Sequence, residues 1–128
     1  MPKFGKKSKA NLKGVNKDLV KVLNEAIKLH DFSVLEGLRG ISKQKDLMAS
    51  GFSMTMKSKH LDGDAVDIAP YPIEWEDELR FCYLAGLMIG ISHMMGIKIR
   101  WGGDWDRDGV ILSDQTFNDL PHFEVVDG

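Results

Sequence analysis

Residues Gly63 to Pro70 read GDAVDIAP, and this short stretch decides the class of fold. Its side chains alternate between two faces, as the two-residue period of a β-strand requires. Asp67 stands on one face with two alanines, and the two β-branched residues stand on the other. Pro70 and Pro72 end the strand, because proline has no backbone N–H to donate to a sheet. We therefore expect a strand from which Asp67 projects.

Helices and further strands are expected on both sides of this strand. Apolar residues recur every three or four positions from Asn16 to Leu29, and acidic residues at 74, 76 and 77 begin a long apolar helix that Gly96 ends. The remaining expected elements are a short helix at 42–49 and strands at 32–38, 97–101 and 122–126, with a long loop from 102 to 121. No helix separates the last two strands. The sequence thus predicts an α+β domain with about three helices and a small, mainly antiparallel sheet. A chain of 128 residues has room for one domain, residues 1–128.

Positive charge is concentrated at the start of the chain. The first eighteen residues contain six lysines and one aspartate, although the net charge of the whole chain is only −2. Aromatic residues other than Phe4 are missing from this segment. The segment could favour anionic surfaces, but we interpret it as a solvated, partly frayed terminus and expect no nucleic-acid binding.

The sequence also bears on compartment and membrane contact. The single cysteine, Cys82, excludes an internal disulfide, and the N-terminal residues lack the apolar core of a secretory signal. The apolar run at 81–97 contains three glycines and is shorter than the roughly 20 residues of a bilayer span. We expect a monomer that accumulates in the cytoplasm and does not insert into a membrane.

Two histidines and a carboxylate could form a metal centre. A catalytic zinc ion needs three protein ligands and an open position for water, and His60, Asp67 and His122 supply a known set. Such a zinc ion lowers the pKa of its water toward about 7. Asp119, three residues before His122, could take the proton of that water as general base. Ser58 could support His60. The same residue types occur together in many proteins without a metal, so spacing alone leaves both interpretations open.

Two motifs resemble those of a known enzyme family. Residues 58–67, SKHLDGDAVD, resemble the first zinc motif of the VanY and D-alanyl-D-alanine carboxypeptidase family, whose fold is shared with hedgehog domains, and residues 119–124, DLPHFE, resemble the second. The run RWGGDW at 100–105 and the Gly37-Leu38-Arg39 segment make the chain still more similar to phage L-alanyl-D-glutamate endopeptidases. The resemblance spans nearly the whole chain.

This resemblance implies a hedgehog-like fold and a zinc-dependent peptidase of bacterial peptidoglycan. It implies three zinc ligands, a catalytic base and a cation that stabilises the developing oxyanion, namely His60, Asp67, His122, Asp119 and Arg39. Gln44 falls where similar enzymes often have a polar residue lining the cleft. A surface arginine and a helix-surface glutamine remain the alternatives for Arg39 and Gln44.

An acidic stretch separates the last two motifs. The enzymes that the chain resembles usually have only a few residues here, whereas residues 106–118 intervene in this sequence. The run from Asp104 to Gly109 repeats the first half of a calcium loop, in which oxygens at alternate positions approach the ion. The second half is missing, since position twelve is Gln115. We expect either a solvated acidic turn or a site for calcium or another hard cation, formed by Asp104, Asp106, Asp108 and Asp114.

Two other functions share most of these features. A D,D- or L,D-carboxypeptidase would use the same zinc centre, but the sequence shows no clear extra cationic pocket for a terminal carboxylate. A non-catalytic, metal-stabilised binding module would need neither Asp119 nor Arg39. The sequence thus favours an endolysin-like hydrolase that cleaves the L-alanyl-D-glutamate bond and reaches the wall after another protein opens the membrane.

Overall fold

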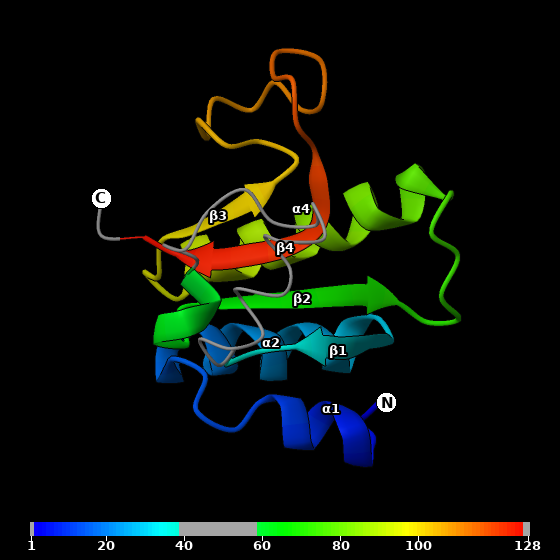
Figure 1. Cartoon of the computed structure of the whole chain (residues 1–128), viewed down its shortest axis with the longest axis vertical. Helices are drawn as coiled ribbons and strands as arrows, with labels where there is room; N and C mark the ends of the chain where they lie inside the picture. The colour runs from blue at the N-terminus through cyan, green and yellow to red at the C-terminus, as the bar shows by residue number, and fades with distance from the viewer. Residues whose placement is uncertain (1, 39–58, 127–128) are drawn as a thin grey trace.

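The computed structural model describes residues 2–38 and 59–126 (Figure 1). Its helices are α1 (Lys6–Asn11), α2 (Lys17–Leu29), the 3-10 helix η1 (Lys59–Asp62) and α4 (Glu78–Met94). Its strands are β1 (Phe32–Glu36), β2 (Ala65–Pro70), β3 (Ile99–Gly102) and β4 (Asp119–Val125). The strands form one antiparallel sheet in the order β1-β2-β4-β3. The predicted α+β class is confirmed.

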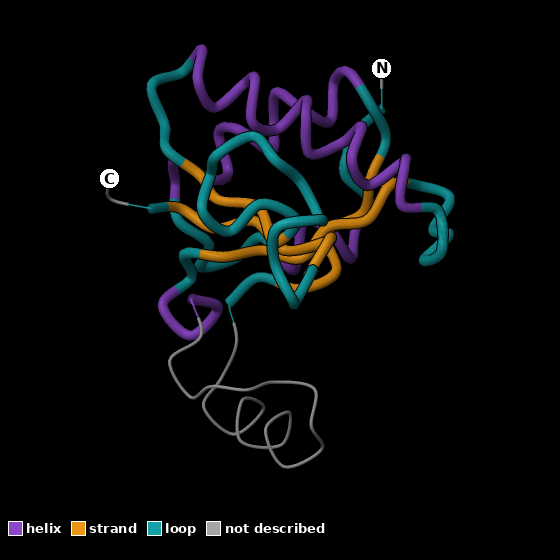
Figure 2. The backbone as a smooth tube through the Cα atoms, turned by 90° about the horizontal axis from the view of Figure 1, so that it is seen from above, coloured by secondary structure: helices purple, strands orange, loops and turns teal. Residues whose placement is uncertain are grey.

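The long helices lie to one side of the sheet (Figure 2). Helices α2 and α4 contact each other and the strands, and the core forms between them and one face of the sheet. Val66, Trp101 and Phe123 point into this core from three adjacent strands. Because neighbouring strand residues point to opposite faces, Asp67 and His122 are directed to the other face. Apolar burial on one side thus fixes which side carries the polar site.

The start of α2 is tied to the turn that leads into β2. Asn16 caps the helix, because its side-chain oxygen accepts hydrogen bonds from the backbone N–H groups of Asp18 and Leu19. Its amide also donates to the carboxylate of Asp64 over 3.1 Å. Gly63 in the same turn has a φ of 76°, and a Cβ there would lie 2.3 Å from a backbone oxygen. Only glycine fits this turn between η1 and β2.

The expectation of a frayed N-terminus is wrong. Residues Lys6–Asn11 form α1, which packs on β1. The Ser8 hydroxyl is buried and accepts a hydrogen bond from the N–H of Val34 at 3.0 Å, and the Asn11 amide donates to the carbonyl of Val34 at 2.8 Å. The lysines of the helix are exposed, as expected. Polar side chains anchor this helix, so the apolar pattern could not reveal it.

Strand boundaries also differ from those expected. The third strand spans Ile99–Gly102, not 97–101. The first strand ends at Glu36, not at residue 38, because its register with β2 shifts after Val34. The last strand begins at Asp119, so the predicted loop is shorter than 102–121. The predicted helix at 42–49 lies outside the described residues. Helix α4, the longest described, is too short to cross a bilayer, and none of the other described helices could do so.

Candidate metal centre and active site

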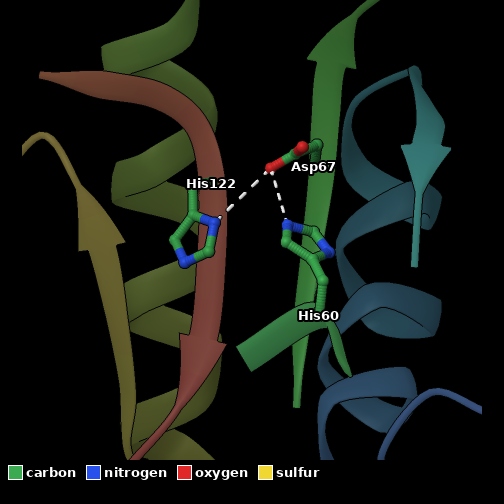
Figure 3. A group of neighbouring side chains, drawn as sticks. All are labelled: His60, Asp67 and His122. Carbon is green, nitrogen blue, oxygen red and sulfur yellow. Dashed lines mark ion pairs between the residues drawn. The ribbon is translucent and has the colours of Figure 1, made fainter. Parts of the chain in front are cut away.

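Three elements bring the predicted ligands together. His60 lies in η1, Asp67 in β2 and His122 in β4, where Asp67 and His122 are paired across the two strands. Figure 3 shows both imidazoles turned toward the carboxylate of Asp67. The Oδ1 atom of Asp67 lies 3.3 Å from Nε2 of His60 and 3.5 Å from Nδ1 of His122. The structure thus gathers residues that are far apart in the sequence into one group.

The donor atoms fit a single tetrahedral metal ion. One candidate ligand atom from each of the three residues lies within 4.8 Å of the other two. Metal–ligand bonds of about 2.0–2.1 Å at tetrahedral angles would place donor atoms roughly 3.3–3.5 Å apart. The two measured separations from Asp67, 3.3 and 3.5 Å, match this spacing. Two imidazoles and one carboxylate also form a set that zinc uses in catalytic sites.

The second nitrogen of each imidazole is held by another group. Nδ1 of His60 donates to the carbonyl oxygen of Gly37 at 2.8 Å, and Nε2 of His122 donates to Glu124 at 2.8 Å. These bonds leave Nε2 of His60 and Nδ1 of His122 directed at Asp67. Metal-binding histidines commonly have such a partner, which selects the tautomer and orients the ring. Both rings are therefore arranged as ligands.

The charges of the group influence one another. Burial opposes ionisation of Asp67, but hydrogen bonds from His122 and His60 outweigh it and hold the pKa of Asp67 well below its usual range. Burial also disfavours a cationic His122, yet the carboxylates of Asp67 and Glu124 raise its pKa to about 9. Without a metal, His122 is thus protonated at neutral pH. A cation that binds there must displace this proton.

Asp119 is brought near the ligands by an irregular pairing of β4. Trp101 pairs with Phe123, but the next residue, Gly102, pairs with Asp119, so β4 bulges over residues 120–122. The Trp101 indole N–H donates to the carbonyl of Leu120 within this bulge at 2.7 Å. A Cβ at Gly102 would lie 2.0 Å from the Asp119 carbonyl oxygen, so only glycine permits this approach. The charge of Asp119 contributes to the raised pKa of His122, and its role as the base stays a prediction.

Comparison with known proteins identifies the family. The model of the phage L-alanyl-D-glutamate peptidase family matches residues 1–126. The chain belongs to this family. It is 36% identical to the L-alanyl-D-glutamate peptidase of Escherichia phage T5 over 115 residues, a match that covers 84% of each chain. The crystal structure of the Serratia marcescens L-Ala D-Glu endopeptidase ChiX superposes with a TM-score of 0.80 at 33% identity, covering 97% of this chain and 90% of that one. The predicted resemblance is therefore confirmed.

Three predicted residues of the peptidase site lie outside the described part of the chain. They are Arg39, Gln44 and Ser58. The roles assigned to them, as oxyanion-stabilising cation, cleft residue and support for His60, stay predictions.

Glu124 is a contact of the peptidase site that the sequence did not assign. The residue is 4% exposed, and its side chain accepts hydrogen bonds from His122 and Arg100. Strand periodicity carries the signal that could have found it, because Glu124 follows His122 by two residues and thus shares its face of β4. Trp105 is a second such contact, with its ring centroid 5.5 Å from that of His122.

The acidic residues of the long loop also meet. Asp104, Asp106 and Asp108 each place a carboxylate oxygen within 4.8 Å of the others. Burial and the neighbouring carboxyl groups of Asp106 and Asp108 raise the pKa of Asp104, while the N–H of Gly109 opposes this rise. The carboxyl group of Asp108 raises the pKa of Asp114, which places the fourth predicted acid beside the cluster.

Gln115, at the twelfth position of this loop, binds backbone groups of the protein. The Gln115 side chain accepts a hydrogen bond from the N–H of Trp105 at 2.9 Å and donates to the carbonyl of Gly102 at 3.1 Å. It thus closes the loop through backbone contacts. Binding of calcium to the four acids stays a prediction.

We expect calcium to raise activity at saturating zinc, because a divalent cation relieves the repulsion among these carboxylates and favours the ordered loop. The loop runs from Asp104 to Asn118 and leads directly into Asp119. Calcium titrations should follow wall lysis and the NMR signals of the loop in wild type and in a variant with Asp106→Asn and Asp108→Asn. Calcium-independent lysis by both proteins would reduce the cluster to an acidic surface turn.

Proposed function

We propose that this chain is a zinc-dependent endopeptidase that cleaves the bond between L-alanine and D-glutamate in peptidoglycan stem peptides. The observation that carries the proposal is the His60, Asp67 and His122 group, whose spacing suits one tetrahedral zinc ion. Membership of the L-alanyl-D-glutamate peptidase family supports the choice of bond. Two relatives with matching activities in their names support it further.

The proposed chemistry divides the work between the metal and the chain. Zinc held by the three ligands would supply a water molecule with a pKa of about 7. Asp119 then takes the proton of the attacking water and returns it to the leaving amine of D-glutamate. Arg39 is proposed to stabilise the charge that develops on the carbonyl oxygen of L-alanine. Residues 1–128 as one domain, the monomeric state and release from the cytoplasm to the wall stay predictions.

Mass spectrometry of digested muropeptides tests the bond directly. Purified peptidoglycan should yield fragments with a new D-glutamate amino terminus and fragments that end in L-alanine. Release of terminal D-alanine would instead identify a carboxypeptidase. Peptidoglycan that is bound but left uncut by the zinc-loaded protein would identify a binding module. A preparation of the Asp67→Ala variant serves as the control for contaminating hydrolases.

A further inference from the structure

An ion pair lies directly behind one of the proposed zinc ligands. Arg100 of β3 and Glu124 of β4 are paired across the two strands, and the guanidinium donates to Oε2 of Glu124 at 2.7 Å. The other carboxylate oxygen, Oε1, accepts the Nε2–H of His122 at 2.8 Å. Glu124 thus bridges a fixed cation and the imidazole.

This bridge determines which nitrogen of His122 faces Asp67. An imidazole without a second contact can rotate and exchange its tautomer. An ionised carboxylate only accepts hydrogen bonds, so the ring nitrogen that faces Glu124 must carry the hydrogen. With Nε2–H bound to Glu124, Nδ1 is the nitrogen directed at Asp67, and its lone pair becomes available to a metal ion that displaces its proton. The partner of a ligating histidine commonly contributes a factor of about 10–100 to metal affinity.

Arg100 keeps the bridge in place. The side chain of Glu124 is almost fully buried, where a carboxylate needs a compensating charge and hydrogen-bond donors. The Arg100 guanidinium provides both, and its Cζ atom lies 5.8 Å from the ring centroid of Trp105. The Trp105 ring in turn packs against His122, and its indole N–H donates to the carbonyl of Phe117. The pair therefore has contacts on several sides.

We propose that Glu124 and Arg100 are positioning residues, in which Glu124 sets the tautomer and orientation of His122 and Arg100 acts through Glu124. The inference rests on the proposed metal function, because His122 needs a fixed Nδ1 only as a ligand. Neither residue is assigned contact with the substrate.

Zinc affinity, measured by competition with a chromophoric chelator, provides a readout that is independent of peptidase activity. Glu124→Ala should weaken zinc binding by about 10–100-fold. The zinc-loaded wild type should also show a slowly exchanging Nε2–H resonance for His122, which Glu124→Ala should lose. Glu124→Gln should keep this resonance, because its amide oxygen can still accept the N–H. If the alanine variant does not fold, Arg100→Met tests the same bridge through zinc affinity, because Arg100 holds Glu124 in place.

A double-mutant cycle tests whether Arg100 acts through Glu124. Arg100→Met should weaken zinc binding in wild type and add no further loss in the Glu124→Gln background, since a neutral amide cannot form the ion pair. Glu25→Ala is the matched control, because Glu25 forms an ion pair of the same length with Lys28, 2.7 Å, on the surface of α2.

The outcomes separate the two proposals. Wild type that binds no zinc overturns the proposed function, and this inference with it. If wild type binds zinc and Glu124→Ala, or Arg100→Met where the alanine variant does not fold, retains the wild-type affinity, the positioning role alone is overturned. If Arg100→Met weakens zinc binding equally in wild type and in the Glu124→Gln background, Arg100 does not act through Glu124.

Discussion

Replacing His60, Asp67 or His122 by alanine is expected to abolish zinc binding and peptidase activity together. Each substitution removes one of three donor atoms that the structure gathers around a common point. Two remaining ligands leave the ion weakly held, so the water nucleophile is lost with the metal. Elemental analysis of the purified variants, beside their rates of muropeptide cleavage, measures both effects.

The matched control is His93→Ala, which removes an exposed imidazole from the last turn of α4. This variant should retain full zinc content and activity. Chelation should likewise abolish hydrolysis by wild type, and added zinc should restore it. Undiminished cleavage by a preparation shown to be metal-free would contradict the zinc assignment.

The pH dependence of zinc binding provides a further measurement on the same site. The pKa of His122 is raised to about 9 in the metal-free fold, above the ordinary value of 6.5. Protons therefore compete with zinc below about pH 9, and affinity should increase as pH rises toward that value. The stability of the metal-free protein changes with pH in the opposite direction. Its favourable term from protonated His122 is complete below about pH 6.5 and is lost as the pH rises through about 9.

The sequence predicted those parts of the site that depend on the two-residue alternation of side chains along a strand. Alternation along GDAVDIAP placed Asp67 on the strand face opposite Val66 and Ile68, and the structure puts these two residues in the core. The same period applied to PHFE would have assigned Glu124 to the face of His122. Local sequence patterns therefore predict which face of a strand a ligand and its immediate neighbours occupy.

The parts that the sequence could not reveal depend on contacts between distant residues. The carbonyl of Gly37 is a backbone group without residue identity, yet it orients His60 from 23 positions away. A Cβ at Gly37 would lie 2.1 Å from the carbonyl oxygen of Asn11, so α1 packs closely behind this support. Neither contact has a periodic signature. The bulge that pairs Asp119 with Gly102 is hidden for the same reason.

Asp119→Ala is expected to lower kcat by about 10²–10⁴ while zinc stays bound. The group of candidate ligands consists of His60, Asp67 and His122, and the charge of Asp119 is close enough to affect the pKa of His122. Its backbone is held by pairing with Gly102. Truncating the side chain should therefore leave β4 and the ligands in place and remove only the proton acceptor.

The variant Asp119→Asn distinguishes proton transfer from shape, because the amide fills the same space and cannot act as a base. It should lose as much kcat as the alanine variant, with KM for a muropeptide close to that of wild type in both. Zinc content near one ion per chain in all three proteins would confirm that the carboxylate works on the proton and not on the metal. If either variant instead loses its zinc, Asp119 is a ligand, and the roles of Asp67 and Asp119 must be reassigned.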